Sequence, residues 1–283
     1  MRFILAFLLC CVIPVAHAAV VTQTVRPGIP ASADYRVGDR DKPAVLLIHG
    51  FLQTREFHTV ATLADGLHDA GYTVLSPTLS LNIPARAQSL PCEAIHRHSL
   101  DDDVDEISRW VQWLKAQGHR SVVLLGHSFG SLQLLAYLSR QPDPVVKGYL
   151  GASLVEAQIG EADRGALIAQ LEDRVRRKQR DLVSQPLSFC RKYTSAPADL
   201  LSYLRWDQPR TLAALRQAPV ETRLIMGDSD NLLGHDWMKA LRHIRTKMVV
   251  VKGANHFMDG EHEFDLLARA LELLGQFNNK VAR

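Results

Sequence analysis

Short continuous apolar runs recur along the chain, separated by longer stretches in which apolar residues return at helical spacing. A run such as 44–48 is typical of a strand that is buried on both faces of a parallel sheet. We predict strands at 44–48, 72–76, 121–125, 146–150, 222–226 and 247–251. The alternation of these strands with helical segments predicts an α/β fold, with a mostly parallel central sheet flanked by helices.

The helical segments are expected at about 60–70, 100–117, 236–244 and 263–277, with another that starts at residue 131. The segment 100–117 has the clearest signals. Ser99 is a suitable N-cap, and acidic residues fill the first turn, where the helix dipole favours negative charge. Its apolar residues share one face: Leu100, Val104, Ile107, Val111 and Leu114.

Residues 155–218 break the alternation of strands and helices. They look helical and contain no evident core strand, which predicts a small helical cap insertion over the carboxyl edge of the sheet. The insertion carries a basic run: Arg174, Arg176, Arg177, Lys178 and Arg180. A solvated helix face explains this run most simply; weak contact with an anionic membrane surface or with an acidic substrate is the alternative.

The first 18 residues have the pattern of a signal peptide. A positive start precedes an apolar stretch at 3–13, and Ala16-His17-Ala18 suits a signal peptidase. We therefore expect a mature chain with one large α/β domain at 19–283 that is periplasmic or secreted. In such an oxidising compartment Cys92 and Cys190 are expected to form one disulfide, with two separate buried thiols as the alternative.

Composition and charge narrow the classes of function. The formal net charge of +3 over 283 residues is too small to indicate nucleic-acid binding. His96-Arg97-His98 lies close to Asp101, Asp102 and Asp103, which raises the question of a metal site. These carboxylates are better explained as residues of the first helical turn, so we expect neither a metal ion nor an organic cofactor.

The pentapeptide Gly126-His127-Ser128-Phe129-Gly130 stands between the predicted strand at 121–125 and the helix that starts at 131. A serine in a strand–turn–helix context of this kind is exposed at the carboxyl edge of the sheet, and the flanking glycines permit the sharp turn. Alone, the pattern also fits a glycine-rich turn with an ordinary surface serine. With suitable partners, Ser128 is a candidate nucleophile.

A serine nucleophile needs a histidine base and an acid that orients it, each on a loop that follows a strand. His256 follows the strand at 247–251 and is the expected base. Asp230 follows the strand at 222–226 and is the expected acid, with Asp228 as the second choice. Either aspartate also suits a turn beside glycine.

Acyl transfer further needs N–H donors for the developing oxyanion. We expect the backbone N–H groups of Phe129 and Phe51 to supply them, Phe51 from the His49-Gly50-Phe51-Leu52 loop after the first core strand. His49 is expected to be a buried histidine that hydrogen-bonds this loop. The apolar residues expected near the site are Leu52, Phe129, Leu232, Leu233 and Phe257, and they favour an apolar acyl group.

With these motifs in this order, the chain resembles the α/β-hydrolase superfamily over about residues 40–280. The resemblance implies the α/β-hydrolase fold, a triad of Ser128, Asp230 and His256, and the two Phe amides as oxyanion donors. Because little sequence precedes the first core strand, we expect the antiparallel strands that usually open this fold to be reduced.

The resemblance further implies a serine hydrolase that cleaves a small carboxylic ester or thioester through an acyl-enzyme and requires no cofactor. The serine at position 128 disfavours the dehalogenase and epoxide hydrolase reactions, for which relatives generally use aspartate at the corresponding turn. An amidase or peptidase with the same triad remains an alternative, as does a non-catalytic binding or envelope protein with this fold. The oligomeric state stays open.

Overall fold

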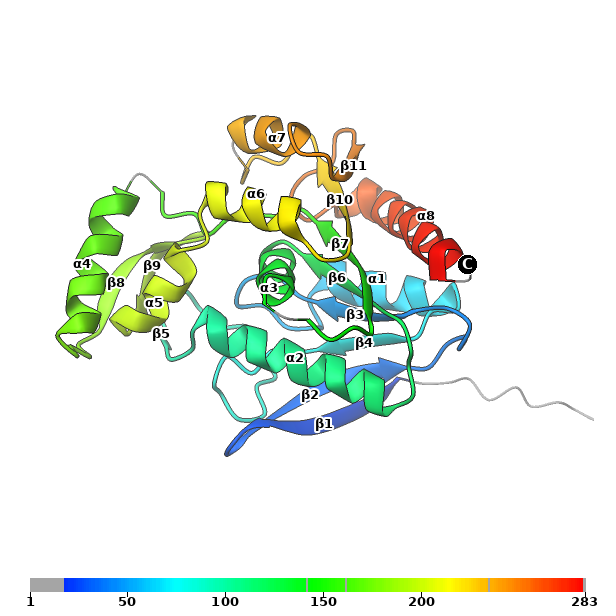
Figure 1. The fold of residues 1–283 in the computed structure, drawn as a ribbon, viewed down its shortest axis with the longest axis horizontal. Coiled ribbons are helices and arrows are strands. Elements are labelled where there is room, and N and C mark those ends of the chain that lie inside the picture. Colours follow the sequence, from blue (N-terminus) through cyan, green and yellow to red (C-terminus); the bar gives the residue numbers. More distant parts are fainter. Residues whose placement is uncertain (1–17, 141, 161, 234, 282–283) are drawn as a thin grey trace, which may run out of the picture.

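A computed structural model describes residues 18–140, 142–160, 162–233 and 235–281. The predicted signal peptide lies outside these residues except for its last position. Figure 1 shows the chain folded around a twisted central sheet. Its eight strands follow the order β1-β2-β4-β3-β6-β7-β10-β11. The six strands from β4 to β11 in this order pair in parallel, which confirms the predicted fold class.

The parallel strands lie within two or three residues of the predicted ranges. They are β3 (Ala44–Ile48), β4 (Val74–Pro77), β6 (Val122–His127), β7 (Val146–Ala152), β10 (Glu221–Gly227) and β11 (Lys247–Val251). Alternate side chains of β3 enter two different cores. Leu46 and Ile48 pack on one face of the sheet, whereas Val45 and Leu47 pack on the other. Burial on both faces explains why β3 is continuously apolar.

Helices cover both faces of the sheet. α1 (His58–Asp69) and α8 (Glu263–Val281) pack against one face through residues that include Leu63 and Leu273. α2 (Leu100–Ala116) and α3 (Phe129–Leu138) pack against the other through residues that include Ile107 and Leu132. α7 (His235–Arg242) precedes β11, and a short 3-10 helix at Gly260–His262 precedes α8.

Ser99 caps α2 as predicted. Its hydroxyl accepts a hydrogen bond from Asp102 N–H at 3.1 Å, and the Asp102 carboxylate accepts one from Ser99 N–H at 2.9 Å. This reciprocal capping box satisfies two backbone donors that a helix start would otherwise leave free. Asp103, by contrast, is fully buried and binds side chains of other helices, so the first-turn explanation holds for only part of the acidic cluster.

The expectation of reduced opening strands is wrong. β1 (Ala19–Arg26) and β2 (Ile29–Arg36) form a full antiparallel hairpin, and β2 pairs antiparallel with β4. The hairpin turns at Pro27-Gly28, where Gly28 has a φ of 75°. The hairpin lies at the sheet edge and is half-exposed. Its sequence therefore lacks the continuous apolar run by which buried strands are recognised.

The predicted cap, residues 155–218, contains three helices and one hairpin. The helices are α4 (Arg164–Arg176), α5 (Pro197–Leu204) and α6 (Gln208–Gln217), and the hairpin is β8 (Val183–Leu187) with β9 (Cys190–Ser195). None of its described strands joins the central sheet, as expected, but the β8–β9 hairpin was not part of the predicted helical cap. β9 also pairs with β5 (Ile95–His96), which makes a second sheet of three strands. Figure 1 shows α4, α5 and this small sheet gathered beside one end of the central sheet.

The basic run of the cap is partly neutralised by its own neighbours. Arg176 and Arg177 both pair with Asp173, and Arg174 lies 3.9 Å from the Asp181 carboxylate. These pairs favour the solvated-face explanation of the run over contact with an anionic surface. Among the described residues, no helix combines the length and the apolar character that crossing a bilayer requires.

Candidate active site

Ser128 lies in a strained turn between β6 and α3, with a φ of 56° and a ψ of −125°. The two glycines of the pentapeptide are sterically required there. A Cβ at Gly126 would lie 2.5 Å from Ser131 N, and a Cβ at Gly130 would lie 2.5 Å from Ile48 O. A positive φ at a non-glycine residue is uncommon and is concentrated at functional sites. The geometry is that of a nucleophile elbow.

His256 joins Ser128 to Asp230. Its Nε2 lies 2.7 Å from Ser128 Oγ, and its Nδ1 lies 2.6 Å from Asp230 Oδ2. Both His256 and Asp230 are buried, so few water molecules compete for these hydrogen bonds. The backbone carbonyl of His256 also accepts hydrogen bonds from Ser153 Oγ at 2.7 Å and from His127 Nε2 at 3.1 Å, which fixes the loop that carries the imidazole.

The structure distinguishes the two candidate acids. Asp230 binds His256 with one carboxylate oxygen, while the other accepts the Leu232 N–H at 2.9 Å. Asp228 is exposed and instead accepts the Gly253 N–H at 2.6 Å. Asp228 therefore connects two loops, and Asp230 is the carboxylate that orients the imidazole.

The two candidate oxyanion donors lie on segments that meet beside Ser128. A Cβ at Gly50 would lie 3.4 Å from Ser128 Cβ, so the loop after β3 directly contacts the elbow. The rings of Phe51 and Phe129 pack with their centroids 4.7 Å apart, which holds this loop against the start of α3. This arrangement places both backbone segments next to the serine hydroxyl, as an oxyanion hole requires.

His49 supports this loop and does not reach the triad. Its Nδ1 donates to Gly50 O at 2.8 Å, and its Nε2 accepts the Leu79 N–H at 3.0 Å. Burial and the nearby Arg86 lower the pKa of His49 to about 3, so the ring is neutral at ordinary pH. His49 thus has the structural place expected from the sequence.

Arg86 is a residue of this site that the sequence did not reveal. Its guanidinium is buried and donates to Leu79 O at 2.7 Å and to Gln53 O at 2.7 Å. These bonds satisfy carbonyl groups of two irregular segments. Gln53 lies in the loop after β3, where Leu52 has a φ of 58°, and Leu79 lies in the segment after β4. Arg86 therefore stabilises the loop that presents Phe51. A single arginine in an irregular segment gives no sequence signal for this role.

Comparison with known proteins is consistent with this geometry. Residues 45–270 match the model of a family described as the alpha/beta hydrolase family. The chain belongs to the alpha/beta hydrolase family. A search of curated protein sequences returned no match.

Solved structures of several alpha/beta hydrolases are similar to this one. Est1E from Butyrivibrio proteoclasticus is 16% identical, with a TM-score of 0.64 over 93% of this chain and 99% of that chain; a further structure of Est1E has ferulic acid bound. The alpha/beta hydrolase GrgF from Penicillium sp. sh18 is 16% identical, with a TM-score of 0.70 over 93% and 99%. The Paleococcus ferrophilus monoacylglycerol lipase is 17% identical, with a TM-score of 0.63 over 87% and 99%.

A cavity of about 230 Å³ opens above Ser128 in this hydrolase. Of the apolar residues expected near the site, Leu232 and Phe257 line it, whereas Leu52, Phe129 and Leu233 are buried in the core. The other lining residues come from the loop after β3, the loops that carry Asp230 and His256, the segment after β7 and the cap hairpin. They are Phe51, Gln53, Val155, Gln158, Ser188, Phe189, Asn231 and His256. The cap residues were missed because nothing in the sequence relates residue 189 to residue 128.

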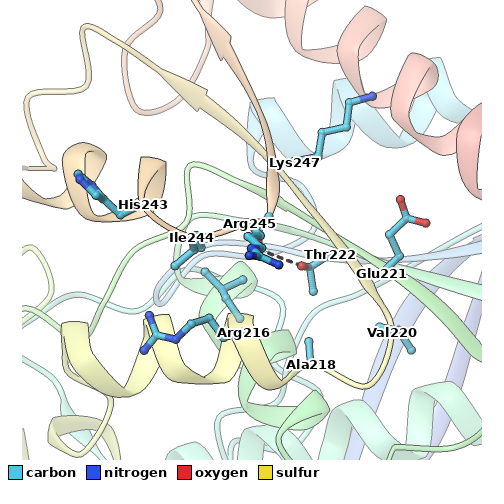
Figure 2. A pocket seen from close by; sticks show the side chains of 11 residues that line it. Arg216, Ala218, Val220, Glu221, Thr222, His243, Ile244, Arg245 and Lys247 are labelled. Carbon is cyan, nitrogen blue, oxygen red and sulfur yellow. Dashed lines mark hydrogen bonds between the residues drawn. The ribbon is translucent and has the colours of Figure 1, made fainter.

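A larger cavity of about 650 Å³ lies away from the triad (Figure 2). It is lined by the first residues of β10 and β11, at the edge of the sheet opposite to the loops that carry Asp230 and His256. Figure 2 shows its nitrogen-bearing side chains, among them Arg216, His243 and Lys247, pointing in different directions. They do not converge on one point, so this cavity is a poor candidate for the reaction.

His98, beside the acidic cluster, takes part in a buried hydrogen-bond network. His98 Nδ1 lies 2.6 Å from Tyr203 Oη, which donates to the Asp103 carboxylate at 2.7 Å. Gln133 Nε2 donates to the same Asp103 oxygen at 2.8 Å. Within the described ranges, no three His, Cys, Asp or Glu side chains are grouped so that they could hold a metal ion. The network instead connects α2 and α3 with the cap helix α5.

Acid should destabilise this protein through its buried histidines. Burial lowers the pKa of His127 to about 4, and that of His49 to about 3, against an ordinary value of 6.5. Between pH 6.5 and 4 the unfolded chain therefore binds protons that the native protein does not, so the free energy of unfolding falls as the pH falls. Each histidine should contribute a loss on the order of 2 kcal/mol between pH 7 and pH 5.

Urea unfolding at several pH values measures this effect. Burial also lowers the pKa of His96 to about 4, so His127→Gln is expected to remove about a third of the pH dependence. His243→Gln, at an exposed position, should leave it unchanged. A free energy of unfolding that is constant between pH 7 and pH 5 would show that neither buried ring is held neutral.

Proposed function

We propose that this hydrolase cleaves carboxylic esters or thioesters through an acyl-enzyme on Ser128. The observation that carries the proposal is the continuous chain of hydrogen bonds from Ser128 through His256 to Asp230, at 2.7 Å and 2.6 Å. A serine hydroxyl becomes nucleophilic when a neighbouring base accepts its proton, and a buried carboxylate stabilises the imidazolium that results.

In the proposed reaction, Ser128 Oγ forms a bond to the substrate's carbonyl carbon while its proton passes to His256 Nε2. The carbonyl oxygen becomes an oxyanion, which the N–H groups of Phe51 and Phe129 stabilise. Collapse of this intermediate breaks the bond to the leaving oxygen or sulfur, which takes the proton from His256. Water then attacks the acyl-enzyme with His256 again as base, which releases the acid and restores Ser128.

The wall of the cavity favours a substrate with an apolar acyl group. Phe51, Phe189 and Phe257 are aromatic, and Val155 and Leu232 are aliphatic. The similar structures include an esterase domain from a Rhodothermus marinus protein and a lipase, which supports ester cleavage as the reaction. We further propose export to the periplasm or beyond. The disulfide between Cys92 and Cys190 supports this, since such bonds persist in oxidising compartments.

A panel of p-nitrophenyl esters and p-nitroanilides with matched acyl groups tests the proposed function. We expect turnover of the esters, with kcat/KM for each anilide at least about 100-fold lower. Comparable rates on the anilides would favour an amidase. No turnover of any ester by the folded protein would contradict the proposal and favour a binding protein with this fold.

A further inference from the structure

The tip of the cap hairpin lies over the candidate active site. β8 and β9 are joined by a two-residue turn, Ser188 and Phe189. This turn connects the paired residues Leu187 and Cys190. Ser188 has a φ of 54°, and its N–H donates to Gln158 O at 2.8 Å. Both turn residues line the 230 Å³ cavity together with Ser128. The turn thus directs its larger side chain toward the nucleophile.

Phe189 is more exposed than is usual for a large aromatic side chain. Its side chain is 56% exposed although it is a large aromatic ring. It packs edge-to-face on Phe51, with centroids 5.6 Å apart and an interplanar angle of 86°. Phe51 in turn packs on Phe129, at the start of the elbow helix. Phe189 therefore extends the aromatic wall of the site outward.

A covalent bond fixes the position of this ring. Cys190, the residue after Phe189, is bonded to Cys92 in the loop between β4 and β5, with Cα atoms 5.3 Å apart and a sequence separation of 98. Cys190 is fully buried, whereas Cys92 is partly exposed. The disulfide therefore attaches the hairpin tip to the body of the hydrolase within one residue of the side chain that forms the wall.

The rest of the cap has a separate anchor. Tyr193 on β9 stacks on His96, with centroids 4.1 Å apart, and its hydroxyl lies 3.3 Å from His98 Nε2. Tyr203 on α5 binds the buried Asp103 carboxylate at 2.7 Å. These contacts do not involve the disulfide. Loss of the disulfide should consequently free the tip of the hairpin while the base of the cap stays in place.

We propose that Phe189, held by the Cys92–Cys190 disulfide, sets the upper limit on the size of the acyl group. This inference rests on the proposed ester hydrolysis. A cavity of about 150 Å³ is enough for one benzene molecule, so a cavity of about 230 Å³ suits a single aromatic ring or a short aliphatic chain. A longer acyl chain has to pass the Phe189 ring. The substrate class is therefore compact acyl esters.

A chain-length profile tests this inference. The measurement is kcat/KM for p-nitrophenyl butanoate, benzoate, octanoate and dodecanoate. The wild-type protein should prefer butanoate and benzoate over dodecanoate. Phe189→Ala should raise the ratio of kcat/KM for dodecanoate to kcat/KM for butanoate by about tenfold or more. Opening space in a hydrophobic pocket changes the discrimination between substrates by this order. Phe189→Trp should lower the ratio.

One further variant tests the role of the disulfide, and another controls for the loss of an exposed aromatic ring. Cys92→Ala combined with Cys190→Ala should shift the ratio in the same direction as Phe189→Ala, because the freed tip no longer holds the ring in place. Phe264→Ala should leave the ratio unchanged, since this ring is 77% exposed on α8 and does not line the cavity. A fluorophosphonate probe, which labels an activated serine, is applied to every variant.

The outcomes separate this inference from the proposed function. If Phe189→Ala is labelled by the probe and hydrolyses butanoate but keeps the wild-type ratio, Phe189 does not limit acyl size. If only the double cysteine variant keeps the wild-type ratio, the ring limits size without help from the disulfide. If the folded wild-type protein neither reacts with the probe nor cleaves any ester, the proposed function itself fails.

Discussion

Replacing Ser128 by alanine is expected to lower kcat for ester hydrolysis by at least about 10⁴-fold, because the variant can no longer form an acyl-enzyme. The loss should fall on kcat and leave the fold intact, since the serine hydroxyl contributes a single hydrogen bond, to His256. Residual activity would come from the oxyanion donors and the cavity. Steady-state kinetics on p-nitrophenyl butanoate, with circular dichroism on the same samples, measure both quantities.

Ser229→Ala is the matched control for this experiment. Ser229 is exposed on the loop that also carries Asp230, and its hydroxyl lies 3.4 Å from Asp228 Oδ1. Its removal should change kcat by less than a factor of about two. If Ser128→Ala kept a tenth or more of the wild-type rate, another group would have to be the nucleophile, and the role given to the elbow would be wrong.

Replacing Asp230 by asparagine is expected to lower kcat by about 10³- to 10⁴-fold, somewhat less than the loss of the serine. The Asp230 carboxylate accepts the Nδ1–H of His256, which leaves Nε2 free to accept the proton of Ser128. An asparagine amide can donate to Nδ1 instead. The imidazole would then carry its proton on Nε2 and could not act as a base toward the serine.

Asp228→Asn is the matched control, because Asp228 lies two residues away and does not reach the imidazole. We expect an effect of less than about tenfold from it, through the lost bond to Gly253 N–H. Measuring kcat for both variants across pH 5 to 9 separates the two aspartates. A large loss for Asp228→Asn with little change for Asp230→Asn would reverse the assignment of the acid.

The sequence predicted the parts of this hydrolase in which local pattern and burial agree. The strands β3 and β6 are buried on both faces, and their residues 44–48 and 122–125 therefore form continuous apolar runs. Parallel strands of this kind all end at one edge, so residues just after them are expected to meet. The structure brings Ser128, Asp230 and His256 together in this way, although 128 residues separate the first from the last.

The parts that the sequence missed depend on contacts between distant segments. The β1–β2 hairpin has too few bulky apolar residues to be recognised, because most of its side chains are partly or fully exposed. The β8–β9 hairpin contains a proline and is completed by β5 and by the disulfide to Cys92. Its ring at Phe189 reaches the cavity only because of these long-range constraints.

The side chains that orient the site are equally invisible to local patterns. Arg86 joins the loop after β3 to the segment after β4 through the carbonyl groups of Gln53 and Leu79, and such bonds impose no residue spacing that a sequence displays. The acidic cluster at the start of α2 shows the same limit. Asp102 lies in the first turn, as predicted, and accepts the Ser99 N–H. Asp103 instead binds Tyr203 and Gln133, which lie far along the chain.

Covalent labelling tests the central claim most directly. The folded protein is incubated with a fluorophosphonate, its intact mass is measured, and the modified peptide is sequenced. We expect the mass to increase by one phosphonyl group, located on Ser128, and we expect Ser128→Ala to show no increase. A folded wild-type protein that stays unlabelled, or that carries the label on another residue, would contradict the account.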